Sequence, residues 1–427
     1  MPSFAEKVLD QAEIPPAFSF RAGQDAPLPS EMSLTRDQTS DGSGAYVYDQ
    51  RKGLYVSRDA DVPRYADDPR IGASRGLLVE AAPRTNHVRW SNKINSTKWS
   101  PNDVSVGAGT NSIIDGQDAF LLKSQNGSLG RIDQSAGAFS SSVEVIWGIL
   151  EEGRSSKSGL GVVSSSSNPG SIEYDWGNGS LTSSGDITAH RRILTETGPN
   201  GGRVVLLIGR YDPTTAAGTD NSGNSRGFRL FPDRNANDES VYAHHAQIEE
   251  APNASSPIVT GSGAVTRQGD DLTLNVGDRW NPNEGTFLVS LSHRHFSLDG
   301  NDEILEGPSN RQYIRQRDKA PPYSFYQMRD GPNSSTANLD TSPNVSPFEP
   351  VKIAVSFSDE VGKIAVNGHT GKEPADFSSL TDLVNIQVGT VPAAVQGLSY
   401  RPSLLPLTES DRSPGDLPSL ETLTSQS

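Results

Sequence analysis

Short apolar segments separated by turns rich in Gly, Pro, Asn and Asp follow one another along most of the chain. Apolar residues alternate over residues 142–149, and residues 203–208 form a nearly continuous apolar run that suits a central strand packed on both faces. Alternation returns at residues 353–357 and 364–366, on either side of a short polar turn, and Asn367-Gly368 follows as a second turn signal. The pattern therefore predicts a mostly β protein.

The composition supports this prediction and suggests the number of domains. Of 427 residues, 33% are hydrophobic and 21% are charged, while Gly and Pro contribute 41 and 29 residues. Gly, Ser, Asn and Thr replace the missing apolar residues, as expected where each strand supplies alternate side chains to a thin core. Because single cores stop growing near about 250 residues, the length suggests two or three domains. The two sets of alternating segments favour two β-sandwich (jelly-roll) domains.

The N-terminus carries the one plausible helix, over Pro2 to Ala12. Phe4, Val8 and Leu9 form its apolar stripe, and Pro15-Pro16 ends it. A helix this short is unstable alone. We expect it to dock on another subunit or a larger assembly, although a loosely packed terminus is the alternative.

A collar of small strands follows, up to residue 86. It holds too little apolar material for an independent core, so a neighbour is expected to complete it, with Phe18 and Phe20 among the contacts. The expected division is a docking and collar region over residues 1–86, a first sandwich over 87–252 and a second over 253–427. Residues 249–257 are predicted to be a linker between the sandwiches.

Charge and cysteine content exclude several classes of function. The net charge of −15 disfavours a nucleic-acid partner, since phosphate binding requires clustered Lys and Arg. With no Cys, disulfide scaffolds, thiol nucleophiles and thiolate metal sites are excluded. The sequence begins without a signal-peptide pattern and has no apolar stretch near the roughly 18 residues that span a bilayer. We therefore expect assembly in the cytoplasm and no membrane insertion.

Several strings resemble segments of known proteins. Residues 57–86, which read SRDADVPRYADDPRIGASRGLLVEAAPRTN, resemble a segment common in virion proteins of tailed bacteriophages, of the fibre, spike and head-decoration kind. There the segment introduces a carbohydrate-binding-like β-sandwich that begins like residues 90–106 and ends like 241–260. Residues 266–270 and 280–289 resemble the start of a laminin-G or concanavalin-type lectin sandwich.

The resemblance implies a virion structural protein, such as a fibre, spike, turret or decoration. Such a protein would dock on capsid or tail proteins through its N-terminal region and display its sandwiches for particle stabilisation or for binding host-surface glycans. It would act as a homo-oligomer, for which we expect a trimer in preference to a pentamer. A cell-surface carbohydrate-binding module is a third class, which the sequence start disfavours.

The competing function is a glycan depolymerase carried on the virion, because laminarinase-like lectin folds place carboxylates at alternate positions of one strand. The nearest string contains Glu173 and Asp175, which share a strand face, but the third carboxylate is absent. We expect an ordinary solvated strand face and no catalytic residues.

The sequence contains few candidate metal ligands, and only its aromatic residues suggest where a glycan could bind. His293 and His295, and the adjacent His244 and His245, are expected on sheet surfaces rather than around a metal. Residues 299–303 form a plain polar turn or, alternatively, bind a structural calcium ion; no other cofactor is expected. Sugar rings stack on aromatic side chains in polar loops, and the glycan-binding candidates by this criterion are Trp176, Tyr211, Tyr323 and Tyr326.

Overall fold

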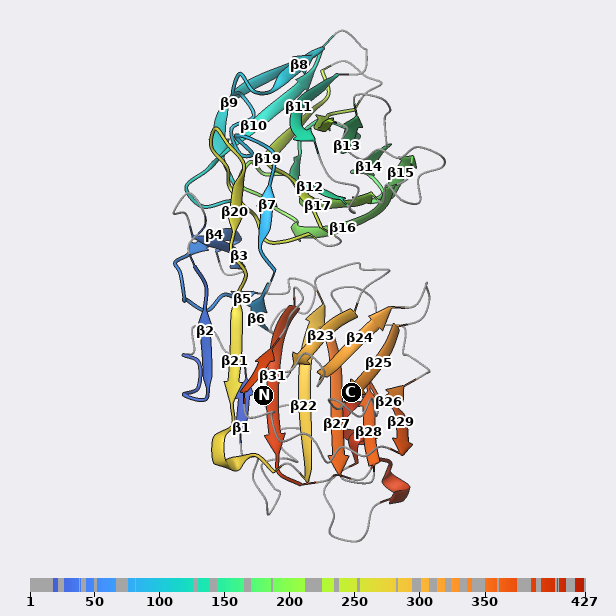
Figure 1. The fold of residues 1–427 in the computed structure, drawn as a ribbon. Coiled ribbons are helices and arrows are strands. Elements are labelled where there is room, and N and C mark those ends of the chain that lie inside the picture. The colour runs from blue at the N-terminus through green and yellow to red at the C-terminus, as the bar shows by residue number, and fades with distance from the viewer. Residues whose placement is uncertain are drawn as a thin grey trace.

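A computed structural model shows an almost entirely β protein, which confirms the predicted fold class (Figure 1). The residues that the structure describes are 18–21, 27–37, 39, 44–49, 52–66, 76–80, 82–125, 130–138, 144–164, 170–185, 187–211, 225–233, 238–251, 254–281, 283–293, 301–306, 313–318, 324–329, 336–339, 350–358, 361–374, 385–388, 393–403, 405, 407–411 and 419–425. The predicted helix over residues 2–12 lies outside them. Within them, a short α2 (Leu420–Thr424) lies near the C-terminus, with η1 (Gly277–Arg279) and η3 (Glu409–Asp411) as single 3-10 turns.

One sandwich, called here the inserted sandwich, is built from residues 100–250 in two six-stranded antiparallel sheets. The first sheet has the order β16 (Ile187–Thr195), β17 (Val204–Tyr211), β12 (Glu144–Glu152), β19 (Ser240–Glu250), β10 (Asp118–Ser124), β9 (Val104–Asn111). The second has the order β15 (Leu181–Gly185), β14 (Gly170–Asp175), β13 (Lys157–Ser164), β18 (Ser225–Phe231), β11 (Arg131–Ala138), β8 (Ser100–Asn102). Phe120, Ile146, Leu160 and Phe228 are among the side chains that fill the space between the sheets.

The second sandwich, called the base sandwich, is formed by both ends of the chain. One sheet has the order β29 (His369–Pro374), β28 (Val361–Val366), β27 (Pro350–Ser358), β22 (Glu284–His293), β31 (Ala393–Arg401), β6 (Gly76–Val79), β5 (Tyr65–Ala66), and β1 (Phe18–Arg21) also pairs with β31. The other has the order β2 (Met32–Thr35), β21 (Asp271–Asn275), β30 (Asn385–Val388), β23 (Asn301–Glu306), β24 (Tyr313–Asp318), β25 (Ser324–Arg329), β26 (Thr336–Leu339).

The inserted sandwich therefore interrupts the base sandwich instead of following a separate collar. The sequence predicts that residues 18–79 belong to the docking and collar region. In the structure, β1, β2 and β6 instead pair with strands that lie beyond residue 270, and β5 pairs with β6, so all four strands belong to the base sandwich. Phe20 is 4% exposed and belongs to the base core, so its assignment as a docking contact is wrong in this conformation. Phe18 lies in β1, and Phe4, Val8 and Leu9 lie outside the described residues.

Two features join the sandwiches (Figure 1). β7 (Arg84–Asn86) and β20 (Val265–Arg267) pair as an antiparallel ribbon where the chain leaves and re-enters the base. The hairpin of β3 (Ala45–Asp49) and β4 (Leu54–Arg58) covers the outer face of the inserted sandwich and also contacts β6. Tyr46, Tyr48 and Tyr55 pack there on Trp147 and its neighbours, while Val47 and Val56 pack on Leu78.

Several local predictions are confirmed. β12 and β17 are buried along most of their length because the sheet is covered on one face by its partner sheet and on the other by the hairpin. β27 and β28 pair antiparallel, and Asn367 and Gly368 both have positive φ in the turn to β29, as a type I′ turn requires.

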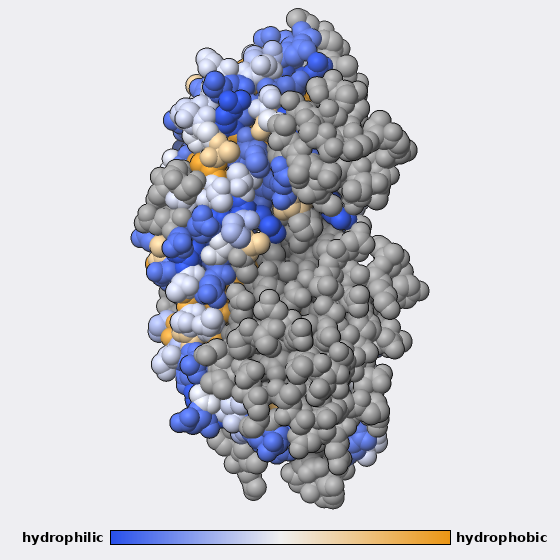
Figure 2. All heavy atoms as spheres, in the orientation of Figure 1, coloured by the Kyte–Doolittle hydropathy of each residue, from blue (hydrophilic) through white to orange (hydrophobic). Residues whose placement is uncertain are grey.

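The surface in the view of Figure 2 is mainly hydrophilic where the structure describes it, with small apolar patches. Among the described residues, the large apolar side chain with the greatest exposure is Val62, at 40%. No helix within these residues is long and apolar enough to cross a membrane.

Candidate functional site

The two glycan-binding candidates whose side chains are described are buried. Trp176 is 3% exposed, packs edge-on against Tyr174 with ring centroids 4.9 Å apart, and donates from Nε1 to Ser158 Oγ at 2.8 Å. Tyr211 is 1% exposed and lies under the guanidinium of Arg226. Neither ring has a free face for a sugar, so both assignments are wrong for this conformation.

The polar residues around Trp176 suggested a loop tip, but the ring turns inward to close the end of the core. Two other candidates remain predictions. Tyr326 lies in β25, whose side chains are not described, and Tyr323 lies outside the described residues.

Glu173 and Asp175 have structural partners. They share the outward face of β14, as their alternation predicted. Glu173 Oε1 forms an ion pair with Lys157 Nζ at 3.1 Å, and Asp175 Oδ1 accepts from the backbone N–H groups of Gly177 and Asn178. The Asp175 carboxylate therefore shapes the following turn.

The adjacent histidines are fully buried, which corrects the expectation that they lie on a sheet surface. His244 contacts Glu151, with Nε2 and Oε2 3.0 Å apart, and His245 Nε2 lies 2.9 Å from Gln247 Oε1. Burial lowers the pKa of His245 to about 4, so its ring is neutral at pH 7. No group of three or more metal-ligating side chains occurs among the described residues; His295 and residues 299 and 300 lie outside them.

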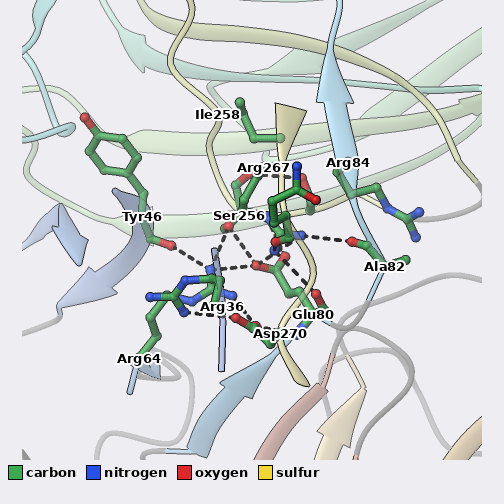
Figure 3. Close-up of polar contacts among 12 residues, drawn as sticks. Arg36, Tyr46, Arg64, Glu80, Ala82, Arg84, Ser256, Ile258, Arg267 and Asp270 are labelled. Atoms are coloured by element: carbon green, nitrogen blue, oxygen red, sulfur yellow. Dashed lines mark hydrogen bonds and ion pairs between the residues drawn. The ribbon is translucent and has the colours of Figure 1, made fainter. Parts of the chain in front are cut away.

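An extensive buried polar site lies between the two sandwiches (Figure 3). We call it the junction cluster, and it consists of Arg36, Arg64, Glu80, Ser256, Arg267 and Asp270. Three arginines and two carboxylates meet there with almost no access to water. These groups are brought together from five separate parts of the chain, so the site exists only in the folded protein.

Arg64 is the centre of the cluster (Figure 3). Its Nη1 donates to Glu80 Oε2 at 2.7 Å and to Ser256 Oγ at 3.0 Å, and its Nη2 donates to Asp270 Oδ2 at 2.5 Å. Asp270 also accepts from Arg36 Nη1 at 2.9 Å through its other oxygen. Both carboxylates are thus held by charged donors, which is the condition under which buried ions are tolerated.

Ser256 connects this charge cluster to the inserted sandwich. Its backbone N–H and its hydroxyl each donate to Glu80 at 2.7 Å. The segment just before it is tied to β19, because the N–H of Ser255 and the side chains of Trp147 and Gln247 all donate to Glu249 Oε1. The predicted linker over residues 249–257 is therefore a packed connection where it is described, and not a solvated one.

The electrostatics at the centre of the cluster favour the charged forms of Glu80 and Arg64. Burial raises the pKa of Glu80, but the nearby guanidinium groups of Arg267 and Arg64 and the bonds from Ser256 outweigh it and hold the pKa well below its usual range. Burial likewise opposes the charge on Arg64, yet Asp270 and Glu80 raise its pKa overall. The shifts of Glu80 and Arg64 therefore both favour the charged form of the central ion pair.

No sequence pattern singles out these residues, although most of them lie in the two segments that resemble virion and lectin proteins. Arg64 and Glu80 lie in the 57–86 segment and Arg267 and Asp270 lie in the 266–270 segment. The available signal was the position of charged residues directly beside short apolar strands in both strings. One amino-acid sequence does not show that these two segments lie side by side in the folded protein.

Comparisons with known proteins find little. No family model and no curated protein matches the chain. Among solved structures, the chain is similar to the CBM40 of the Ruminococcus gnavus IT-sialidase bound to alpha2,3 sialyllactose, with 12% identity over 34% of this chain and 84% of that one, at a TM-score of 0.26.

The same search finds the CBM22-1-CBM22-2 tandem domain of Paenibacillus barcinonensis Xyn10C, with 13% identity over 77% of this chain and 98% of that one, at a TM-score of 0.25. It also finds domains LG4-5 of the mouse laminin alpha1 chain, with 10% identity over 70% and 91%, at a TM-score of 0.20. Scores this low carry no argument about this chain.

Proposed function

We propose that the chain is a non-catalytic structural protein that displays its inserted sandwich on a rigid base, and that it serves in a virion. The observation that carries the proposal is the junction cluster, since it joins the N-terminal strands, the base and the inserted sandwich through buried ionic contacts. A loosely tethered pair of domains needs only a solvated linker.

The virion role is supported by the resemblance of residues 57–86 to segments of phage fibre, spike and decoration proteins. The charges that hold the junction include Arg64 and Glu80 of this segment. In this proposal the residues before β1, including Phe4, Val8 and Leu9, dock on capsid or tail proteins, and the chain acts as a homo-oligomer, with a trimer preferred. Hydrolysis of glycans is not favoured, because Glu173 is paired and Asp175 caps a turn.

The test is electron microscopy of particles purified from the culture that produces the protein, labelled with antibody against the chain. We expect label on the particle surface in a symmetric arrangement. A full-length variant with Phe4, Val8 and Leu9 all changed to Ser is expected to fold but not to join the particle, and Val62→Ser is the matched surface control. Label found only in the soluble fraction, together with a monodisperse monomer by light scattering, would contradict the proposal.

A further inference from the structure

A polar groove of about 760 Å³ opens on the outer face of the inserted sandwich. Its walls come from the ends of β10 and β19, the turn after β12, and the loop between β16 and β17. The hairpin that covers the rest of this face packs on Trp147 and Ile149, further along β12. The volume falls in the range of roughly 300–1,000 Å³ that is typical of small-molecule sites.

The sheet contributes two largely apolar side chains to the lining of the groove, Leu121 and Tyr242. Leu121 and Tyr242 face each other directly across the β10–β19 pair, so their side chains lie on the same face of the sheet. Both are partly exposed, in contrast to their neighbours Leu122 and Val241, which point into the core. A partly exposed tyrosine beside an aliphatic side chain offers one flat surface on which a sugar ring can stack.

The charges that line the groove cancel. Three cations, Lys123, Arg154 and Arg203, face three anions, Glu152, Glu196 and Asp238. Two pairs neutralise each other directly: Lys123 Nζ lies 2.8 Å from Asp238 Oδ1, and Arg203 Nε lies 2.9 Å from Glu196 Oε2. A groove with no net charge does not attract a polyanion, which excludes nucleic acid and strongly sulfated chains as preferred ligands.

Several polar groups in the groove keep unused hydrogen-bonding capacity. Within the described part of the chain, the side chain of Glu152, the hydroxyl of Tyr242 and Oδ1 of Asn200 have no hydrogen-bond partner, and Arg154 has only a longer-range attraction to Asp238. Together they supply donors and acceptors to the groove that Leu121 also lines. Hydroxyl-rich ligands need this mixture, because each hydroxyl both donates and accepts.

The groove is held open before any ligand arrives, because Glu151 fixes the loop that forms one wall. Its Oε1 accepts from the backbone N–H groups of Asn200 at 2.8 Å and Gly202 at 2.9 Å. Its Oε2 contacts Asn200 Nδ2 at 2.8 Å and His244 Nε2 at 3.0 Å.

The hydrogen bond at His244 Nδ1 determines which tautomer the ring adopts. Because His244 Nδ1 accepts from the N–H of Ile113 at 3.1 Å, the neutral ring carries its proton on Nε2 and donates to Glu151. A preformed wall lowers the ordering cost of binding.

We propose that this groove binds a neutral oligosaccharide, with one sugar ring stacked on Tyr242 beside Leu121 and its hydroxyls bonded by Glu152, Arg154 and Asn200. The inference deepens the proposed display function by naming the ligand class and the site of the displayed sandwich. It names a tyrosine that the sequence patterns did not suggest, whereas two of the suggested rings, Trp176 and Tyr211, are buried.

The experiment is a binding titration of the full chain with neutral hexasaccharides of glucose, xylose, mannose and galactose, with heparin hexasaccharide as the anionic comparison. We expect saturable binding of at least one neutral probe below about 1 mM, with little dependence on salt. Tyr242→Ala is expected to weaken it at least about tenfold, and Tyr242→Phe by about threefold at most. Thr188→Ala, an exposed change on β16 of the same sheet, is the matched control and should change nothing.

Each outcome decides the matter. No neutral probe bound, affinity unchanged in Tyr242→Ala, or a preference for heparin that falls steeply with salt would each overturn the inference. Thermal unfolding of Tyr242→Ala identical to the wild type shows that a loss of binding is local. Particle labelling is measured separately, so the chain can fail as a glycan binder while remaining a virion component, or the reverse.

Discussion

Replacing Arg64 with Met is the sharpest test of how the two sandwiches are joined. The change keeps a long side chain but removes the guanidinium that donates to Glu80, Ser256 and Asp270. Arg36 still pairs with Asp270, but Glu80 keeps only Arg267, whose Nη2 is 3.8 Å away, and the hydroxyl and N–H of Ser256.

The expected cost follows from burial. Removing one partner from a buried ion pair typically costs about 3–5 kcal/mol, because the remaining charge is left without compensation in a site closed to water. Arg64 has no exposed surface, so the full range applies. Arg279→Met is the matched control: its ion pair with Glu31 is similar in length, at 2.8 Å, but lies at the surface, where such pairs contribute about 1 kcal/mol or less.

The assay is denaturant unfolding followed by tryptophan fluorescence, with calorimetry in parallel. Trp280 lies in the base sandwich, whereas Trp99, Trp147 and Trp176 lie in the inserted one and Trp90 accepts a hydrogen bond from Trp99 Nε1. Trp280→Phe therefore leaves a signal from the inserted side. We expect one cooperative transition for the wild type and two separated transitions for Arg64→Met. The idea that the cluster couples the sandwiches would be refuted if Arg64→Met lowered the free energy of unfolding no more than Arg279→Met does and still unfolded in a single transition.

Three further outcomes are expected. Burial holds the pKa of His245 near 4, below its value in the unfolded chain, so the neutral ring contributes on the order of 3 kcal/mol to stability above about pH 6.5, and this contribution is lost as the pH falls towards 4. His245→Gln should therefore flatten the pH dependence of the free energy of unfolding between these values. An unchanged slope would contradict this expectation. Glu151→Ala leaves up to four donors without their acceptor and should speed amide exchange in the loop between β16 and β17, at a cost of about 3 kcal/mol; unaltered exchange there would argue against the network. Gly159→Ala places a Cβ against the carbonyl oxygen of Ile172 and should cost about 2 kcal/mol in chemical denaturation, whereas Gly261→Ala meets no atom within 4 Å and should be close to neutral; equal effects would remove the packing argument.

Local patterns in the sequence predicted the local structure well. Alternation placed Ile353, Val355 and Phe357 on one face of β27, and Asn367-Gly368 produced the expected turn. These features depend on a few neighbouring residues and on φ/ψ preferences that are the same in any fold.

The candidate binding residues could not be chosen in this way. Trp176 stands among polar residues and Tyr242 is flanked by Val241 and Ala243, yet the Trp176 ring closes a core whereas the Tyr242 ring remains partly exposed in a groove. Which face of a strand is covered depends on the sheet or hairpin that packs over it, and those partners are distant along the chain. Sequence patterns alone could not tell that Trp176 and Tyr211 are buried.

The amino-acid sequence by itself determined the strands, the turns and the all-β class, because these follow from residue periodicity and backbone preferences. Tertiary structure alone decided that the first and last parts of the chain share one sandwich, that Arg64, Glu80 and Asp270 meet in a dry cluster, and that Tyr242 lines a groove. The physical reason is that strand pairing, ion pairing and burial depend on distances between segments up to hundreds of residues apart. Those distances are set when the whole chain folds.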